Sequence, residues 1–297
     1  MNNGRATPLI ASVCYVRLAV SEPSASARFV SDVFGLQRVV DQDGEIAFRS
    51  DDRFRTVSLG QDFTDGASVG IEVWNDTALA EIGRQLRELG FAVKEATASE
   101  CQRRYVQSAL LTEDASGNRI DLVVRPTRSG RRYFPPRDAG IVAFHGVGLR
   151  STDHARDLAF WRALGAEVSD WVGDIAYLRT DGLHHRIALY PSNRNGLLYA
   201  AFEVEALDQI MQNSYFMQES QIRIVQGPGR EPASRQMFLH VEGPDGLIFS
   251  YVNGMAELDA KPRPARQFPL AASSLCDWGS ESKDVTELRA PMNGRTT

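Results

Sequence analysis

The strongest constraint on the fold is an internal repeat, because the second half of the sequence restates the segment order of the first half about 130 residues later. The clearest corresponding pairs are Tyr15 with His145, Gly35 with Gly165, and Ile46 with Ile175. Several segments that recur in one order at one spacing indicate a duplication, since chance seldom produces such a match. We therefore predict two domains of the same fold.

Each half divides in turn into two units with the same order of elements. Val16–Val20 and Val147–Leu149 have the alternating polarity of half-buried strands. Ala25–Phe34 and Ala155–Leu164 have apolar residues at helical spacing, and further alternating runs follow them. The sequence therefore predicts an α+β fold built from four βαβββ units, two in each domain.

Residues that favour helix ends flank both of these helices. Ser24 and Asp153 stand where an N-cap side chain can bind the free amides of the first turn. Gly35 and Gly165 follow the last turn, where a residue in the left-handed conformation is needed. We predict that the helices begin after the first pair and end at the second pair.

A segment rich in arginine, proline and glycine separates the two halves, and the 297 residues suffice for about two domains. We predict an N-terminal domain over residues 8–126 and a linker over 127–140. A C-terminal domain over 141–255 is expected to carry the pocket, and a polar tail over 256–297 is expected to run across the surface.

Composition excludes several classes of function. The 33 Lys and Arg residues against 38 Asp and Glu residues give a formal charge of −5 with no basic block, which argues against nucleic-acid binding. No apolar run reaches the roughly 18 residues of a membrane span, and the first residues do not read as a signal peptide. Cys14, Cys101 and Cys276 lack metal-ligand spacing, so we expect reduced thiols in a cytoplasmic protein. A homo-oligomer is left open.

Two motifs in the second half extend the pattern beyond composition: GPGR from Gly227 and PDGLIFSY from Pro244. With the paired units, they resemble the vicinal oxygen chelate superfamily, the glyoxalase/bleomycin-resistance/dioxygenase fold. The nearer likeness is to the two-domain type I extradiol ring-cleaving dioxygenases, over most of the chain. The resemblance implies a C-terminal pocket in which two histidines and one glutamate hold Fe(II) or Mn(II), leaving open positions for a catechol and O₂.

The metal ligands of that family are only partly matched here. His145 matches the first histidine, but Tyr199 and Ser250 stand where the family has its second histidine and its glutamate. The resemblance therefore implies a disrupted, degenerate metal site. Two alternatives remain for the cofactor: none, or Fe(II) or Mn(II), for which Glu231 with His145 and His240 would form a relocated site.

Further pocket residues follow from the same likeness. His185 matches the family's acid/base histidine, and an imidazole with a pKa near 6.5 can take and return a catechol proton. His184 and His185 are adjacent, so on a strand they would face opposite sides and only one would enter the pocket. The complete expectation has His185, His240 and Tyr199 as catalytic residues, and His145, Glu231, Ser250 and Tyr251 as substrate-binding residues.

The leading functional hypothesis is an extradiol-dioxygenase-like enzyme, an oxidoreductase of aromatic compound catabolism. It would act on a small catechol-like or quinonoid substrate, with O₂ if the ring is opened. Because the ligand set is incomplete, metal-free chemistry of the isomerase or lyase kind stays open. The alternative is a catalytically inactive protein of the same fold that sequesters an aromatic ligand.

Overall fold

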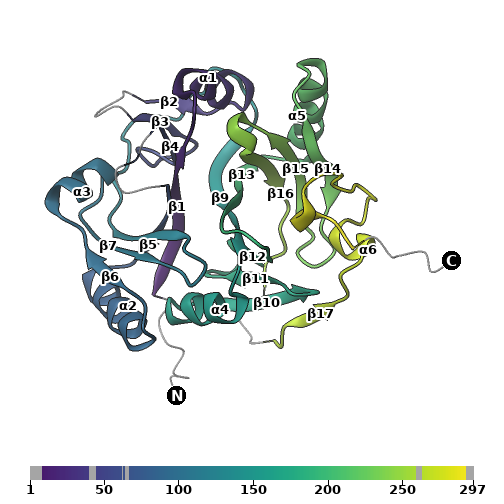
Figure 1. The fold of residues 1–297 in the computed structure, drawn as a ribbon. Helices are drawn as coiled ribbons and strands as arrows, with labels where there is room; N and C mark the ends of the chain where they lie inside the picture. Colours follow the sequence, from purple (N-terminus) through teal and green to yellow (C-terminus); the bar gives the residue numbers. More distant parts are fainter. Residues whose placement is uncertain (1–8, 40–44, 62, 64–66, 259–262, 292–297) are drawn as a thin grey trace.

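The computed structural model describes residues 9–39, 45–61, 63, 67–258 and 263–291. Two mixed sheets, one from each half of the chain, lie side by side with helices packed against them (Figure 1). The α+β fold and the pairing of βαβββ units are therefore confirmed.

The first sheet has eight strands in the order β2-β3-β4-β1-β5-β8-β7-β6. Its two units meet at β1 and β5, which are antiparallel, whereas β1 with β4 and β5 with β8 are parallel. The strands are β1 (Ile10–Ala19), β2 (Gln37–Arg38), β3 (Ile46–Arg49), β4 (Val57–Gly60), β5 (Ser68–Val73), β6 (Val93–Glu95), β7 (Ser108–Glu113) and β8 (Arg119–Val124). The helices are α1 (Pro23–Arg28), continued by a π-helical turn (Phe29–Val33), α2 (Asp76–Glu88) and α3 (Ala98–Arg104).

The second sheet repeats this plan in the order β14-β15-β16-β13-β9-β12-β11-β10, and β17 extends it at the β10 edge. Its strands are β9 (Ile141–Ser151), β10 (Glu167–Val172), β11 (Ile175–Arg179), β12 (Ile187–Pro191), β13 (Gly196–Val204), β14 (Ile224–Arg230), β15 (Met237–Glu242), β16 (Ile248–Asn253) and β17 (Arg266–Phe268). Its helices are α4 (His154–Ala163) and α5 (Leu207–Glu219). The units joined at β9 and β13 correspond to those joined at β1 and β5, as the repeat predicts.

Three of the four predicted helix-end residues are confirmed. The Asp153 side chain accepts a hydrogen bond from the Arg156 amide at the start of α4. Gly35 and Gly165 have φ angles of 95° and 94°, the left-handed conformation that glycine adopts without strain. The prediction for Ser24 is wrong, because α1 already begins at a proline, a residue well suited to the first helical position.

The two faces of the second sheet have different surroundings. One side, the outer face, carries Phe202, Phe249 and Tyr251 and belongs to a core shared with the first domain. The other side, the inner face, carries a separate cluster that includes Tyr199 and Phe238. Because successive side chains of a strand point to opposite faces, adjacent residues of β16 belong to different cores.

The tail is more than a surface covering. It adds β17 in parallel to β10, and α6 (Ala272–Leu275) and a 3₁₀ turn (Thr286–Leu288) follow. Cys276 and Leu288 are buried against the inner-face cluster. The expectation of a tail that only crosses the surface is therefore wrong for these segments, because they close one side of the inner face. No helix of the described residues is long and apolar enough to cross a membrane.

Candidate active site

His145 lies where β9 departs from regular pairing with β13, between the pairs Gly146–Ala201 and Phe144–Phe202. This irregularity positions a buried imidazole with both nitrogens facing protein groups. Its Nδ1 is 3.2 Å from Nη1 of Arg186 and 3.6 Å from Oε2 of Glu203, and its Nε2 is 3.1 Å from Nε2 of Gln236. Burial lowers the pKa of His145, although Glu203 opposes the shift, so the ring is neutral at neutral pH.

His184 and His185 lie in the loop before β12 rather than on a strand, and both are buried. Their Nδ1 atoms are 3.1 Å apart, and Nε2 of His184 is 2.8 Å from Oδ2 of Asp170. The strand argument for this pair is therefore wrong, because strand alternation does not apply to a loop, whereas the expectation that only one of them enters the pocket stays a prediction. Burial lowers the pKa of His185 well below its usual value, and the nearby His184, His145 and Arg186 reinforce the shift.

Three tyrosines, Tyr177 of β11, Tyr190 of β12 and Tyr199 of β13, form a buried row on the inner face. The rings of Tyr190 and Tyr199 meet edge to face, with their centroids 6.0 Å apart. Burial raises the pKa of each phenol well above 10, so all three are un-ionised donors. The ring of Tyr199 covers Gly148, where a Cβ atom would lie only 2.4 Å from a ring carbon. The tyrosine at the second ligand position therefore depends on that glycine.

Glu231 follows β14 and is buried near this row of tyrosines, whose pKa values its charge helps to raise. Its carboxylate accepts a hydrogen bond from the Ser234 hydroxyl. Burial raises the pKa of Glu231 to about 7, and Ser234 only partly offsets this effect. The inner face thus contains a carboxyl group that can exchange a proton at neutral pH.

His240 and Ser250 are directly paired across β15 and β16 and therefore share one face. The His240 ring lies against Tyr199 and Phe238, with centroid distances of 5.1 Å and 4.8 Å, which identifies that face as the inner one. Within the described part of the chain, neither Nδ1 of His240 nor Oγ of Ser250 has a hydrogen-bond partner. Burial also lowers the pKa of His240 to about 3, so its ring is neutral.

Tyr251 does not join the other predicted residues. It follows Ser250 on β16 and so points to the outer face, where its ring stacks on Phe34 at 4.3 Å. Its hydroxyl donates to the Phe34 carbonyl oxygen and accepts from Nη2 of Arg137, both at 2.7 Å. The expectation of a substrate-binding Tyr251 is thus corrected to an interdomain contact, because of the two-residue period of the strand.

The structure also adds residues that were not among the predicted catalytic and substrate-binding residues. Arg186 and His184 adjoin His185, so their position beside a predicted site residue was the available signal. The partners of Asp170 come from 14 or more positions away along the chain, and no local pattern marks it. The added residues are Asp170, Tyr177, His184, Arg186, Tyr190 and Gln236.

At the corresponding place in the first domain, the repeat has become an ion-pair network. Asp121 accepts hydrogen bonds from the hydroxyls of Tyr15 at 2.9 Å and Ser68 at 2.7 Å. Arg104 binds the same carboxylate at 2.9 Å. These buried groups are satisfied by one another, as is typical of a structural network.

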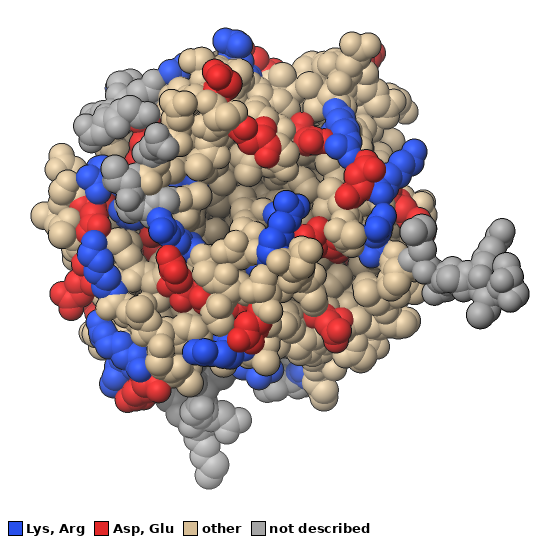
Figure 2. Space-filling view, in the orientation of Figure 1, with Lys and Arg blue, Asp and Glu red and all other residues tan. Residues whose placement is uncertain are grey.

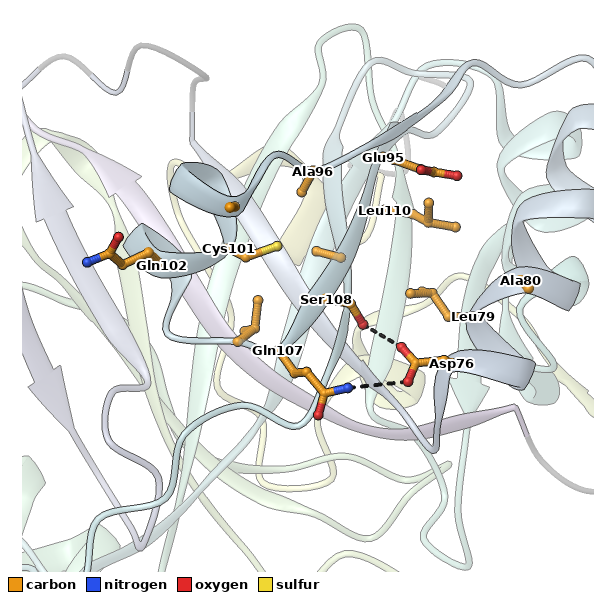
Figure 3. Close-up of a pocket in the computed structure, with 13 residues that line it drawn as sticks. Asp76, Leu79, Ala80, Glu95, Ala96, Cys101, Gln102, Gln107, Ser108 and Leu110 are labelled. Carbon is orange, nitrogen blue, oxygen red and sulfur yellow. Dashed lines mark hydrogen bonds between the residues drawn. The ribbon is translucent and has the colours of Figure 1, made fainter.

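Two cavities lie elsewhere. One, of about 510 Å³, lies between α2, α3 and the strands β6 and β7, and in it Ser108 and Gln107 bind Asp76 (Figure 3). The other, of about 330 Å³, lies between the domains and includes Arg17 and Leu197. On the face shown in Figure 2, basic and acidic side chains are interspersed around a shallow hollow rather than gathered by sign.

Comparison with known proteins gives the class of the second half. Residues 143–251 match the family "Glyoxalase/Bleomycin resistance protein/Dioxygenase superfamily", so this part of the chain is a domain of that superfamily. Extradiol dioxygenases are among the relatives of the chain. The "Iron-dependent extradiol dioxygenase" of Rhodococcus jostii (strain RHA1) is 29% identical over 224 residues, 68% of this chain and 75% of the relative. The "3-methylcatechol 2,3-dioxygenase" of Pseudomonas putida (strain F1) is 24% identical over 264 residues, 82% and 90% of the two chains.

Solved structures agree with this fold. A halotolerant catechol dioxygenase superposes with a TM-score of 0.81 at 18% identity, over 88% of this chain and 92% of the other. The Mn(II)-bound glyoxalase from Novosphingobium aromaticivorans superposes equally well, at 21% identity over 91% of each chain. At these identities the superpositions establish the two-domain fold, while the chemistry rests on the residues present.

Those residues do not fit the metal that the superfamily suggests. Arg186 places a cation beside one nitrogen of His145, and Gln236 faces the other. Tyr199 is an un-ionised phenol, and Ser250 offers only a neutral hydroxyl. Within the described ranges, no three His, Cys, Asp or Glu side chains are placed to hold a metal ion, and this includes the relocated set expected around Glu231.

Proposed function

We propose that the inner face binds a small aromatic compound with two neighbouring oxygen atoms, catechol-like or quinonoid, and moves a proton on it. The relatives support the substrate class, because one is a biphenyl-2,3-diol dioxygenase and another a 3-methylcatechol dioxygenase. In this proposal the chain is an extradiol-dioxygenase-like enzyme with a non-standard site.

The observation that carries the proposal concerns two paired residues: among the described residues, Nδ1 of His240 and Oγ of Ser250 have no hydrogen-bond partner. A buried polar atom without a hydrogen bond is destabilising by about 1–3 kcal/mol, so a ligand that binds both atoms at once gains affinity. Their cross-strand position suits two adjacent oxygens better than one. The aromatic rings of Tyr199 and Phe238 lie beside them, where an aromatic ligand would pack.

The roles follow from protonation states. His185 is neutral and acts as the general base for a ring hydroxyl, then as the acid that returns the proton. Tyr199 and His240 orient the substrate oxygens, while His145 and Glu231 bind at the edges of the site. No step is assigned to a metal ion. Proton transfer of this kind permits isomerisation of a catechol-like or quinonoid compound.

The second candidate is a protein that sequesters the aromatic ligand without turning it over. The contacts of His145 favour this second candidate. Arg186 and Gln236 face the two ring nitrogens of His145, the residue at the family's first ligand position, and so leave neither nitrogen open to a metal ion. Both candidates bind the ligand on the same face, so binding alone does not distinguish them, whereas turnover of the bound compound does.

The test combines binding, turnover and metal analysis. Protein purified without chelators is titrated with 3-methylcatechol and biphenyl-2,3-diol, and turnover is followed with and without O₂. We expect a Kd of about 1–100 μM, weakened at least roughly 10-fold by Ser250→Ala and by His240→Phe, each equivalent to about 1.4 kcal/mol. His154→Gln is the matched control, since this histidine lies on α4 and its ring nitrogens are also buried with no hydrogen-bond partner among the described residues.

Binding that is unchanged in both inner-face variants would exclude this face as the site. Stoichiometric Fe or Mn with a ring-cleaved product would contradict metal-free chemistry. Binding without turnover would select the sequestering protein.

A further inference from the structure

Asp170, His184 and His185 form a continuous buried chain beside the inner face. Asp170 and His184 are fully buried and His185 is nearly so. The chain runs from Oδ2 of Asp170 to Nε2 of His184 over 2.8 Å, and from Nδ1 of His184 to Nδ1 of His185 over 3.1 Å. The proposed function uses only the last of these three residues.

The state of Asp170 determines the direction of the hydrogen bonds. Its carboxylate accepts from the side chains of Arg263 and Arg266 and from the Arg266 amide. Burial would raise its pKa, but the hydrogen bond from His184 and these arginine contacts keep it well below the usual range. An ionised carboxylate can only accept, so Nε2 of His184 must carry a proton toward it. Burial lowers the pKa of His184, so at neutral pH its Nδ1 is bare and acts as an acceptor.

We infer that His184 and Asp170 are positioning residues that hold His185 in the tautomer protonated at Nδ1, so that Nε2 is presented to substrate as the base. With an acceptor at Nδ1 of His184, the 3.1 Å contact requires the donor to be Nδ1 of His185. The remaining nitrogen, Nε2, then carries the lone pair. This inference rests on the proposed function for its catalytic meaning, but the tautomer can be measured without any substrate.

The chain also accommodates the charge that the reaction creates. When Nε2 of His185 takes the proton of a ring hydroxyl, the imidazolium keeps Nδ1–H directed at His184, whose other nitrogen is bound to the Asp170 carboxylate. The substrate oxygen retains the electron pair, and the proton returns to substrate from Nε2. The charged and aromatic groups that face this pair are His145 and Arg186 on the His185 side, Tyr177 against both rings, and Arg263 and Arg266 behind Asp170.

Nuclear magnetic resonance of ¹⁵N-histidine-labelled protein tests the assignment directly, because the chain has only five histidines. In the wild type at pH 7.5 we expect His185 to show a protonated Nδ1 and a bare Nε2. His184→Gln can still reach Asp170 but offers His185 no acceptor, so the His185 tautomer should become mixed or invert. His184→Asn places an amide oxygen near the former Nδ1 and should preserve the wild-type tautomer. His154→Gln is the control.

Kinetics on the same variants supply the second readout. We expect His184→Gln to lower kcat roughly 10-fold or more with KM little changed, and His184→Asn to restore part of the loss, a pattern that simple loss of structure would not produce. Backbone amide spectra establish that each variant is folded. Should His184→Gln not fold, Asp170→Asn provides the same comparison.

A wild-type His185 with bare Nδ1, or an Nδ1–H tautomer that persists in His184→Gln, would overturn the inference. If the tautomers are as expected but the protein neither binds nor converts catechols, the proposed function is contradicted. The hydrogen-bond assignment is still supported in that case.

Discussion

The carboxyl group of Glu231 makes stability depend on pH in a predictable direction. Its pKa is raised to about 7 in the folded protein, from an ordinary value near 4.5. Between these values the folded state binds more protons than the unfolded state, so this group makes the protein less stable as the pH rises from about 4.5 to 7.

We therefore expect Glu231→Gln to stabilise the protein relative to wild type more at pH 8 than at pH 5, by up to about 3 kcal/mol. Urea unfolding of both proteins at the two pH values measures the difference. Ser234→Ala is the companion variant, because removing the hydroxyl that donates a hydrogen bond to this carboxylate should steepen the pH dependence. An equal effect of Glu231→Gln at both pH values would contradict a titrating buried carboxyl.

Tyr251 and Tyr199 make a second comparison between residues, because they lie on opposite faces of one sheet. Tyr251→Phe removes a hydroxyl that donates to Phe34 and accepts from Arg137, so we expect a loss of about 1–2 kcal/mol in the free energy of unfolding and unchanged aromatic binding. Tyr199→Phe should instead weaken binding of 3-methylcatechol. A Tyr251→Phe variant that binds less tightly without being destabilised would return this residue to the site.

The tail elements show where the amino-acid pattern predicts less than the structure reveals. The tail is polar with several prolines, so nothing local indicates that Leu288 packs against the inner-face cluster. Its burial depends on partners such as Arg150, which binds Glu287 at 2.8 Å from far away in the chain. In contrast, Gly35 and Gly165 were predictable because helix ends depend on local backbone geometry.

We expect Leu288→Ala to lower the free energy of unfolding by about 2–4 kcal/mol, as for other buried leucines, and to weaken aromatic binding. Leu270→Ala in the same tail is the control, since this side chain is 39% exposed and should change stability by less than about 0.5 kcal/mol. Chemical denaturation and ligand titration of the two variants decide the point. Equal effects would mean that the tail does not support the inner face.

The same distinction, between features set by neighbouring residues and features set by residues far away in the sequence, explains which site residues could be predicted. His145, Tyr199, His240 and Ser250 lie on strands of the second sheet, where the family resemblance predicts them, whereas His185 lies in the loop before β12. The prediction for Tyr251 is wrong because this residue follows Ser250 on β16 and so points to the opposite face of the sheet. The strand argument for His184 is wrong because the sequence did not show where β12 begins. The chain from Asp170 to His185 joins β10 to the loop before β12, and arginines of the tail bind Asp170, so only the folded structure brings these groups together.

At the scale of the whole molecule, the two domains share one core despite the linker between them. Phe34 of the first domain contacts Phe202, Phe249 and Tyr251 of the second, with ring centroids 4.3–5.2 Å apart. At another point, the Ser116 amide donates to Asp157 at 3.0 Å. Each domain therefore leaves large apolar surface exposed if its partner unfolds.

This shared core predicts a single cooperative unfolding transition, in which the calorimetric and van't Hoff enthalpies agree. Phe34→Ala removes a fully buried ring and should lower stability by about 3–5 kcal/mol. Because the loss lies between the domains, it should either shift the single transition or split it into two. Phe48→Ala is the matched control, as this ring is equally buried but lies within the first sheet, where its loss should lower stability by weakening that domain alone. Two transitions in the wild-type protein would show that the domains unfold independently and that the interdomain contacts of Phe34 contribute little.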